Sequence, residues 1–81
     1  MKLLYFSAPW CGPCRMLGPI MDEVSQQISI QKIDVDKEQD LSAQYGIRNI
    51  PTIVKVDSQG VEIKRILGMQ NKNQIIEFYN G

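Results

Sequence analysis

Apolar residues follow two different spacings along this chain, and the change between them predicts a strand followed by a helix. Residues 2–6 form a short apolar run with aromatic side chains and no alternation, which is typical of a strand buried on both faces. From Pro13 to about Gln27, apolar residues recur every three or four positions, which predicts a helix with one buried face. That face consists of Cys14, Leu17, Met21, Val24 and Ile28.

The middle of the chain predicts a second strand and a short helix. The β-branched residues between Ile30 and Val35 favour a strand. The acid-rich stretch that begins at Asp36 is typical of a first helical turn, and we expect this helix to run to Tyr45. Gly46 is the C-terminal glycine that commonly ends a helix.

The last third predicts a hairpin and a final helix. Strands at 52–56 and 61–67 flank the turn Asp57-Ser58-Gln59-Gly60, whose composition and spacing are typical of a β-hairpin. A last helix is expected from Asn71 to Tyr79, with Ile75, Ile76 and Tyr79 facing inward.

The predicted order is therefore β-α-β-α-β-β-α. The strands of a β-α-β unit pair in parallel, whereas those of a hairpin pair antiparallel. We expect a four-stranded mixed sheet with helices on both faces, which is a three-layer α/β fold. At 81 residues the chain has room for a single domain, residues 1–81.

Composition narrows the classes of function. The chain is 43% hydrophobic and 22% charged, which is typical of a globular protein. Nine basic and nine acidic residues cancel without forming a basic run, so binding to nucleic acid is disfavoured. No apolar stretch reaches the length that spans a membrane, and the N-terminal apolar run is too short for a signal peptide. We expect a monomer in the cytoplasm.

The stretch Trp10-Cys11-Gly12-Pro13-Cys14 holds both cysteines and the single tryptophan. Two thiols three positions apart at a helix start lie on one turn, close enough to form a disulfide. The first thiol lies at the helix N-terminus, where free amides favour a thiolate, and the second lies further in and should be more buried. Proline suits a first-turn position, and glycine leaves room for another backbone to approach the sulfur. This pattern indicates thiol–disulfide exchange.

Three other interpretations of the two cysteines stay open. A zinc site needs about four ligands, and without histidine this chain could form one only by sharing ligands across a dimer. A purely structural disulfide is disfavoured because so short a loop restrains little of the chain. Two inert buried thiols would suit an interior helix better than this turn. The sequence therefore predicts no metal.

Several segments in order along the chain resemble the thioredoxin family. The most specific is Ala8-Pro9-Trp10-Cys11-Gly12-Pro13-Cys14-Arg15-Met16, followed by Pro19 inside the next helix. Lys32-Ile33-Asp34-Val35-Asp36, then Tyr45-Gly46-Ile47-Arg48-Asn49-Ile50-Pro51-Thr52, and the glycines Gly60 and Gly68 complete the resemblance. It implies a thioredoxin-like fold with strand order 2-1-3-4.

The resemblance also implies an activity and its residues. Cys11 would be the attacking thiolate and Cys14 the resolving thiol of a dithiol–disulfide oxidoreductase. Its partners would be protein disulfides and a reductase or small-thiol reductant, and it would need no cofactor beyond the redox-active disulfide. Pro51 matches a cis-proline that leaves the backbone of Ile50 free to pair with a substrate strand. The expected substrate surface comprises Trp10, Gly12, Pro13, Ile50, Pro51, Gly68 and Met69.

Two features depart from the family pattern. The chain begins at the strand that leads into the motif, as in shortened relatives such as glutaredoxins. A glutathione-dependent, glutaredoxin-like role is weakened by the Gly12-Pro13 pair and by the lack of a basic cluster. The second departure is Tyr5, which takes the place of a buried acid behind the cysteines. We expect its hydroxyl to bond either Lys32, a trapped water, or some backbone carbonyl.

We therefore expect a small protein-disulfide reductase. The rival hypothesis is a binding module in which the same surface serves as a partner subunit and the thiols are incidental. A variant that lacks both thiols would separate the two, because only the module would keep its function.

Overall fold

The computed structural model describes residues 1–81 and contains four strands and three helices. They are connected in the predicted order β-α-β-α-β-β-α. Their bounds are β1 Lys2–Ser7, α1 Gly12–Val24, β2 Ile30–Asp34, α2 Gln39–Gln44, β3 Thr52–Val56, β4 Glu62–Leu67 and α3 Lys72–Asn80.

The four strands form one mixed sheet with the order β2-β1-β3-β4, which confirms the expected topology. β1 pairs in parallel with β2, so that Tyr5 lies opposite Lys32, and antiparallel with β3, so that Tyr5 also lies opposite Ile53. β3 and β4 form the antiparallel hairpin. Because β1 has a neighbour on both sides, the strand that leads into the cysteine motif is held at the centre of the sheet.

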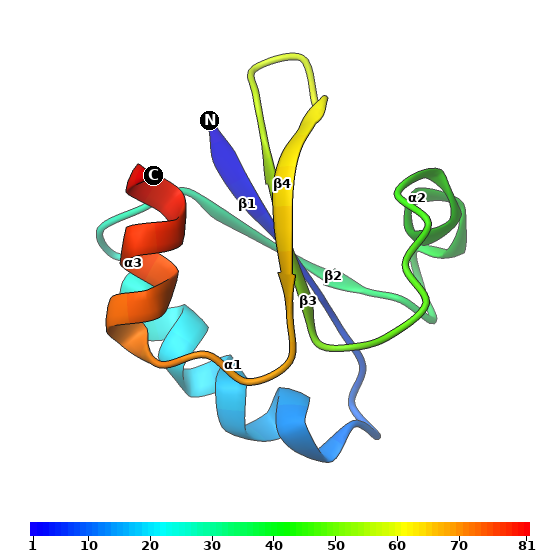
Figure 1. Cartoon of the computed structure of the whole chain (residues 1–81). Helices are drawn as coiled ribbons and strands as arrows, with labels where there is room; N and C mark the ends of the chain where they lie inside the picture. The colour runs from blue at the N-terminus through cyan, green and yellow to red at the C-terminus, as the bar shows by residue number, and fades with distance from the viewer.

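The helices cover the sheet from both sides (Figure 1). α1 and α3 pack side by side on one face, over a core to which β1 and β3 also contribute. α2 lies on the other face, where half-buried residues such as Leu41 and Tyr45 pack against a second, smaller core. The larger core consists of Leu3, Tyr5, Leu17, Met21, Val24, Ile53, Ile75 and Phe78.

Two helices are shorter than the sequence pattern predicts. α1 ends at Val24 instead of about Gln27, because the amide of Gln27 turns back to the carbonyl of Val24, a bond that tightens the end of the helix. α2 begins only at Gln39, because the preceding residues form a turn around Asp34, whose side-chain oxygen accepts from the amide of Asp36 at 2.9 Å. Short acidic side chains commonly capture nearby amides in this way, in competition with the helix.

α3 buries a different residue from those predicted. Ile75 is fully buried as expected, but Phe78 accompanies it in the core while Ile76 and Tyr79 are only half-buried. Residues three positions apart lie on the same side of a helix, so burial of Ile75 also buries Phe78. The hydroxyl of Tyr79 donates to the carbonyl of Met1 at the edge of the core.

No helix of this protein combines the length and the apolar character that are needed to cross a membrane.

Candidate active site

The two cysteines lie where the central strand passes into α1. β1 ends at Ser7, and the amide of Cys11 donates to the carbonyl of Ala8 at 3.1 Å, which turns the chain into the helix. Cys11 is the N-cap residue: its sulfur accepts a hydrogen bond from the amide of Cys14 at 3.2 Å. One of the otherwise unpaired first-turn amides therefore points at this sulfur, which stabilises negative charge on it.

Cys11 and Cys14 form a disulfide, with their Cα atoms 5.2 Å apart. In this oxidised state the two residues are almost equally buried, with 6% and 4% of their surfaces exposed. The sequence predicted a more buried second cysteine, and the difference is small because the covalent bond holds both sulfurs in one apolar pocket. Ala8 and the half-buried Val35 and Ile50 line that pocket.

The loop before β3 lies beside the first sulfur. The Ile50–Pro51 peptide bond is cis, and the carbonyl oxygen of Ile50 lies 3.9 Å from Cys11 Sγ. Neither the amide nor the carbonyl of Ile50 has a backbone partner within the chain. The amide of Gly68 donates to the carbonyl of Pro51 at 2.9 Å, and Gly68 has φ +82°, a conformation that glycine adopts without strain.

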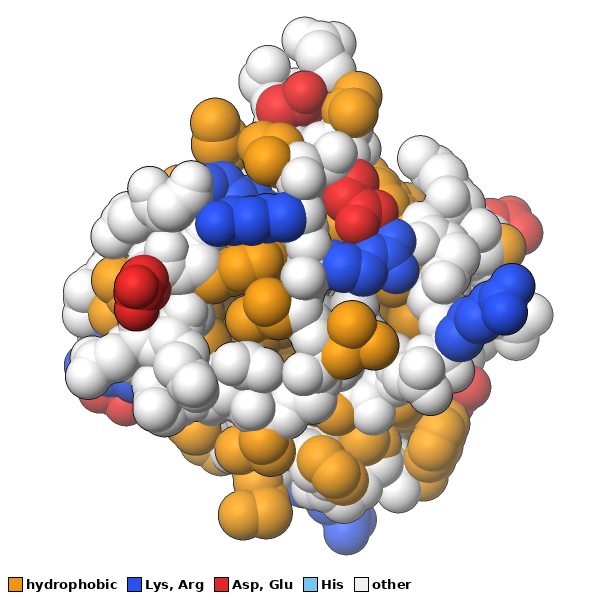
Figure 2. Space-filling view, in the orientation of Figure 1, with side chains coloured by type: hydrophobic (Ala, Val, Ile, Leu, Met, Phe, Trp, Pro, Cys, Tyr) orange, Lys and Arg blue, Asp and Glu red, His pale blue; other side chains and the backbone are white.

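Large apolar side chains are exposed around this loop and the helix start. Trp10 and Met69, two residues of the expected substrate surface, are 68% and 44% exposed, and Met16 and Leu67 are exposed as well. Apolar side chains gather at the lower end of the molecule in Figure 2, where α1 begins. The surface beside the disulfide is therefore rich in apolar side chains.

Asp36 is a site residue that the sequence analysis missed. Its Oδ2 accepts a hydrogen bond from the indole Nε1 of Trp10 at 2.8 Å, which connects the motif to the turn after β2. The residues lie 26 positions apart. The only signal in the sequence is that Asp36 closes the segment after the second strand, at the same end of a parallel sheet as the motif.

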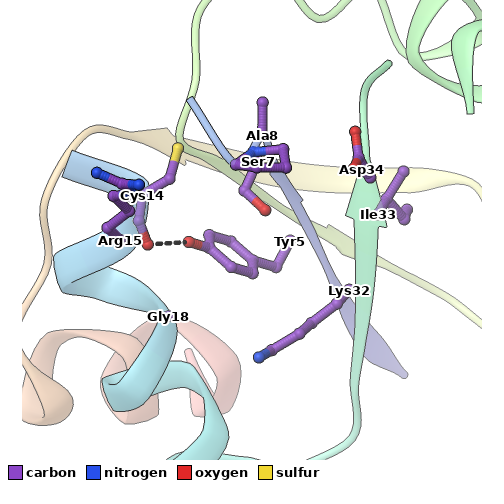
Figure 3. Close-up of a pocket in the computed structure, with 10 residues that line it drawn as sticks. Tyr5, Ser7, Ala8, Cys14, Arg15, Gly18, Lys32, Ile33 and Asp34 are labelled. Carbon is purple, nitrogen blue, oxygen red and sulfur yellow. Dashed lines mark hydrogen bonds between the residues drawn. The ribbon is translucent and has the colours of Figure 1, made fainter. Parts of the chain in front are cut away.

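The hydroxyl of Tyr5 donates to the backbone carbonyl of Cys14 at 3.0 Å, and not to Lys32 (Figure 3). Lys32 instead pairs with Asp22 of α1. Of the expected alternatives, the carbonyl partner is the correct one. Burial raises the pKa of Tyr5, an effect that the Ser7 side chain opposes and the Asp22 carboxylate reinforces, so the hydroxyl stays protonated near neutral pH.

A pocket of about 360 Å³ that is open to solvent lies behind the motif, between α1 and the strands β1 and β2. Figure 3 shows that the Tyr5 ring and the side chain of Lys32 extend into it from neighbouring strands. Its wall consists of Tyr5, Ser7, Ala8, Pro9, Cys14, Arg15, Gly18, Lys32, Ile33 and Asp34.

The protein brings no three potential metal-ligating side chains together, counting histidine, cysteine, aspartate and glutamate. The two cysteines are bonded to each other. The bonded pair supplies thiol–disulfide chemistry at this site.

Comparison with known proteins identifies the family. Residues 1–80 match the family described as Thioredoxin. The thioredoxin of Rickettsia felis is 38% identical over 82 residues, which cover 96% of this chain and 77% of that protein. Thioredoxin 1 of Synechococcus elongatus is 40% identical over 77 residues, which cover 90% of this chain and 71% of that protein.

A solved structure agrees. A point mutant of thioredoxin from Halobacterium salinarum superimposes with a TM-score of 0.88 at 34% identity, and the match covers 98% of this chain and 71% of that one. The fold, the bonded cysteine pair at a helix start and these similarities lead to one conclusion: the chain belongs to the thioredoxin family and is a thiol–disulfide oxidoreductase.

Proposed function

We propose that this protein reduces disulfides of other proteins in two steps, through a mixed disulfide on Cys11. In the reduced protein, the thiolate of Cys11 attacks a substrate disulfide, and one substrate sulfur leaves as a thiolate. The thiolate of Cys14 then attacks Cys11 Sγ. The Cys11–Cys14 bond forms, the second substrate sulfur leaves and takes up a proton, and the substrate has gained two electrons.

The observation that carries this proposal is the amide of Cys14 at 3.2 Å from Cys11 Sγ. This amide lies at the positive end of α1, so it favours the thiolate form of Cys11 over the thiol. Only the thiolate attacks a disulfide, and the first step therefore belongs to Cys11. Cys14 has no comparable donor on its sulfur, which suits the role of second nucleophile.

The backbone of Ile50 supports docking of an extended substrate segment. Its amide and carbonyl are unpaired within the chain, and the carbonyl lies 3.9 Å from Cys11 Sγ. An extended peptide that pairs with Ile50 would bring its own disulfide to Cys11. Pro51 adds no amide that competes for the peptide, while Trp10, Gly12, Pro13, Gly68 and Met69 would contact its side chains.

After each cycle the Cys11–Cys14 disulfide must be reduced by a reductase or a small thiol, since no other electron source is part of the proposal. The protein would act as a monomeric single domain in a reducing compartment such as the cytoplasm, where a close cysteine pair is more often catalytic than structural. Lys32, paired with Asp22, would support the position of α1 from β2.

Trapping tests the proposal. Cys14→Ser should hold protein substrates on Cys11 as mixed disulfides that dithiothreitol releases, whereas Cys11→Ser should trap none and should lose insulin reduction. The Cys11→Ser, Cys14→Ser double variant is the control for binding without chemistry. If the double variant binds partner proteins as well as the wild-type protein does, the binding module is supported. If the wild-type protein reduces protein disulfides only when glutathione is present, a glutaredoxin-like role is supported.

A further inference from the structure

The resolving cysteine is held from behind by one buried side chain. The hydroxyl of Tyr5 donates to the carbonyl of Cys14 at 3.0 Å, and Tyr5 is only 2% exposed. Its backbone lies in the central strand, opposite Lys32 on one side and Ile53 on the other, so it is anchored to the most constrained part of the sheet. The bond therefore connects the first turn of α1 to a rigid support.

One side of this turn packs against Ala8, Val35 and Ile50, but the other side lacks packed neighbours. An open pocket of about 360 Å³ lies there, and Cys14, Arg15 and Gly18 of α1 line one side of it. Surface that faces an open pocket lacks the contacts that a packed interior supplies. The other polar connection between α1 and these strands, from Lys32 to Asp22, reaches the helix eight residues further along and is half-exposed.

The backbone of Cys14 takes part in one hydrogen bond to a strand side chain and one to the sulfur of Cys11. Its carbonyl accepts from Tyr5, and its amide donates to Cys11 Sγ at 3.2 Å. In the disulfide, the covalent bond holds the two sulfurs together as well. When that bond opens, the hydrogen bonds remain as the restraints on where the second sulfur lies.

We propose that Tyr5 is a positioning residue that raises the effective concentration of the Cys14 thiol at Cys11. A group held near its reaction geometry reacts as if it were far more concentrated, because less entropy is lost when the bond forms. This role rests on the proposed function of Cys14 as the resolving thiol. The hydroxyl acts through its neutral form and exchanges no proton with the thiols.

Effective concentration is measured directly by equilibrating the protein with a thiol of the glutathione class. Protein dithiol and glutathione disulfide exchange to protein disulfide and two molecules of glutathione, so atoms and electrons balance. Tyr5→Phe removes the hydroxyl and keeps the ring. It should lower the effective concentration about three- to tenfold, the range that corresponds to one net hydrogen bond. Collapse of a preformed mixed disulfide on Cys11 should slow by a similar factor.

Two variants separate this role from a general loss of stability. Glu23→Gln removes the ion pair between α1 and Lys72 of α3, and Tyr79→Phe removes a tyrosine hydroxyl that donates to the carbonyl of Met1. Both should keep the effective concentration of the wild-type protein. Tyr5→Leu is a second variant without the hydroxyl, and it should also lower the effective concentration of the Cys14 thiol. Agreement between the two Tyr5 variants would show that the loss of the hydroxyl, and not the packing of the phenylalanine ring, lowers this concentration.

The proposal fails if Tyr5→Phe keeps the wild-type equilibrium and collapse rate, or if Glu23→Gln lowers both as much. Failure of the proposed function looks different. In that case the wild-type protein would not reduce protein disulfides, and Cys14→Ser would trap none, whatever the equilibrium with glutathione. The thiol equilibrium needs only the cysteine pair, so it tests Tyr5 independently of any substrate.

Discussion

The indole of Trp10 is fixed to Asp36 by a hydrogen bond of 2.8 Å, although the ring itself is 68% exposed. An exposed aromatic ring would normally sample several rotamers. Here the carboxylate that follows β2 holds the ring in one orientation next to the disulfide. Because the ring is already ordered, a protein that docks on it loses less entropy.

We expect Asp36→Ala to weaken substrate docking without altering the chemistry. KM for a protein disulfide should rise about threefold, in line with the loss of one exposed hydrogen bond, while kcat stays constant. Trp10 is the single tryptophan, so the fluorescence anisotropy of the protein should fall as its ring becomes mobile. Asp40→Ala, which removes the same charge without touching Trp10, serves as the control. A KM unchanged by Asp36→Ala would show that the orientation of the ring is irrelevant to docking.

Cys11 should be alkylated before Cys14 in the reduced protein. Its sulfur accepts the first-turn amide of α1, and thiolates react with iodoacetamide whereas thiols do not. With limiting reagent near pH 6, peptide mapping should find label on Cys11 at roughly five times or more the level on Cys14. Equal labelling, or labelling of Cys14 first, is incompatible with the proposed order of attack.

Oxidation should stabilise the fold. A disulfide that closes a loop of this size lowers the conformational entropy of the unfolded chain, which raises the free energy of unfolding by about 2 kcal/mol. Urea unfolding with and without a reductant measures the difference in the free energy of unfolding. Cys11→Ser should unfold at the urea concentration of the reduced protein, with or without reductant. If the reduced and oxidised proteins unfolded at the same concentration, the disulfide would contribute nothing to stability.

A pair on β4 should make stability depend on pH. The guanidinium of Arg65 donates to the Glu62 carboxylate at 2.7 Å, and this hydrogen bond lowers the pKa of Glu62. The positive charge of Arg65 lowers this pKa further, whereas partial burial of the carboxylate raises it. Because the pKa of Glu62 is lower in the folded state than in the unfolded state, the pair stabilises the protein at pH values above the unfolded-state pKa. This stabilisation is lost as the pH falls through the folded-state pKa.

Glu62→Gln should therefore lower the free energy of unfolding by about 0.5 kcal/mol at pH 7, a small amount because the pair is partly solvated. The gap between variant and wild type should narrow below about pH 4, where the wild-type carboxylate becomes protonated. Urea unfolding at both pH values measures this change. Glu77→Gln, on α3, is the control, because no ion pair holds that carboxylate. A gap of the same size at both pH values would contradict the assignment.

The sheet and its topology could be predicted because the relevant information is local. Apolar runs, helical spacing and the hairpin turn each lie within a few residues, and the parallel and antiparallel pairings follow from the connections. The late start of α2 could not be read in this way. Helical propensity favoured Asp36 as the first turn, but the Asp34 carboxylate bonds the amide of Asp36, and that competition depends on the end of the preceding strand.

The parts of the site that depend on neighbouring residues in the sequence could be predicted. The contacts between segments that are distant in the sequence could not. Cys11 and Cys14 lie on one turn, so their disulfide could be expected. The family resemblance put Tyr5 behind the cysteines, but it could not decide between Lys32 and a carbonyl as the partner of its hydroxyl. That choice depends on how closely α1 approaches the sheet, and on Asp22 having already paired with Lys32.

The turn between β3 and β4 lies at the opposite end of the molecule from the start of α1 (Figure 1). Asp57 closes it by accepting from the amides of Gln59 and Val61, at 2.8 and 3.0 Å, and the hydroxyl of Tyr45 donates to the carbonyl of Gly60. Exposed loop tips of this kind tolerate change, and the side chains of Ser58 and Gln59 are exposed. A label carried by one of these two side chains would therefore leave the disulfide free, and would allow the protein to be immobilised with its reactive end toward the solution.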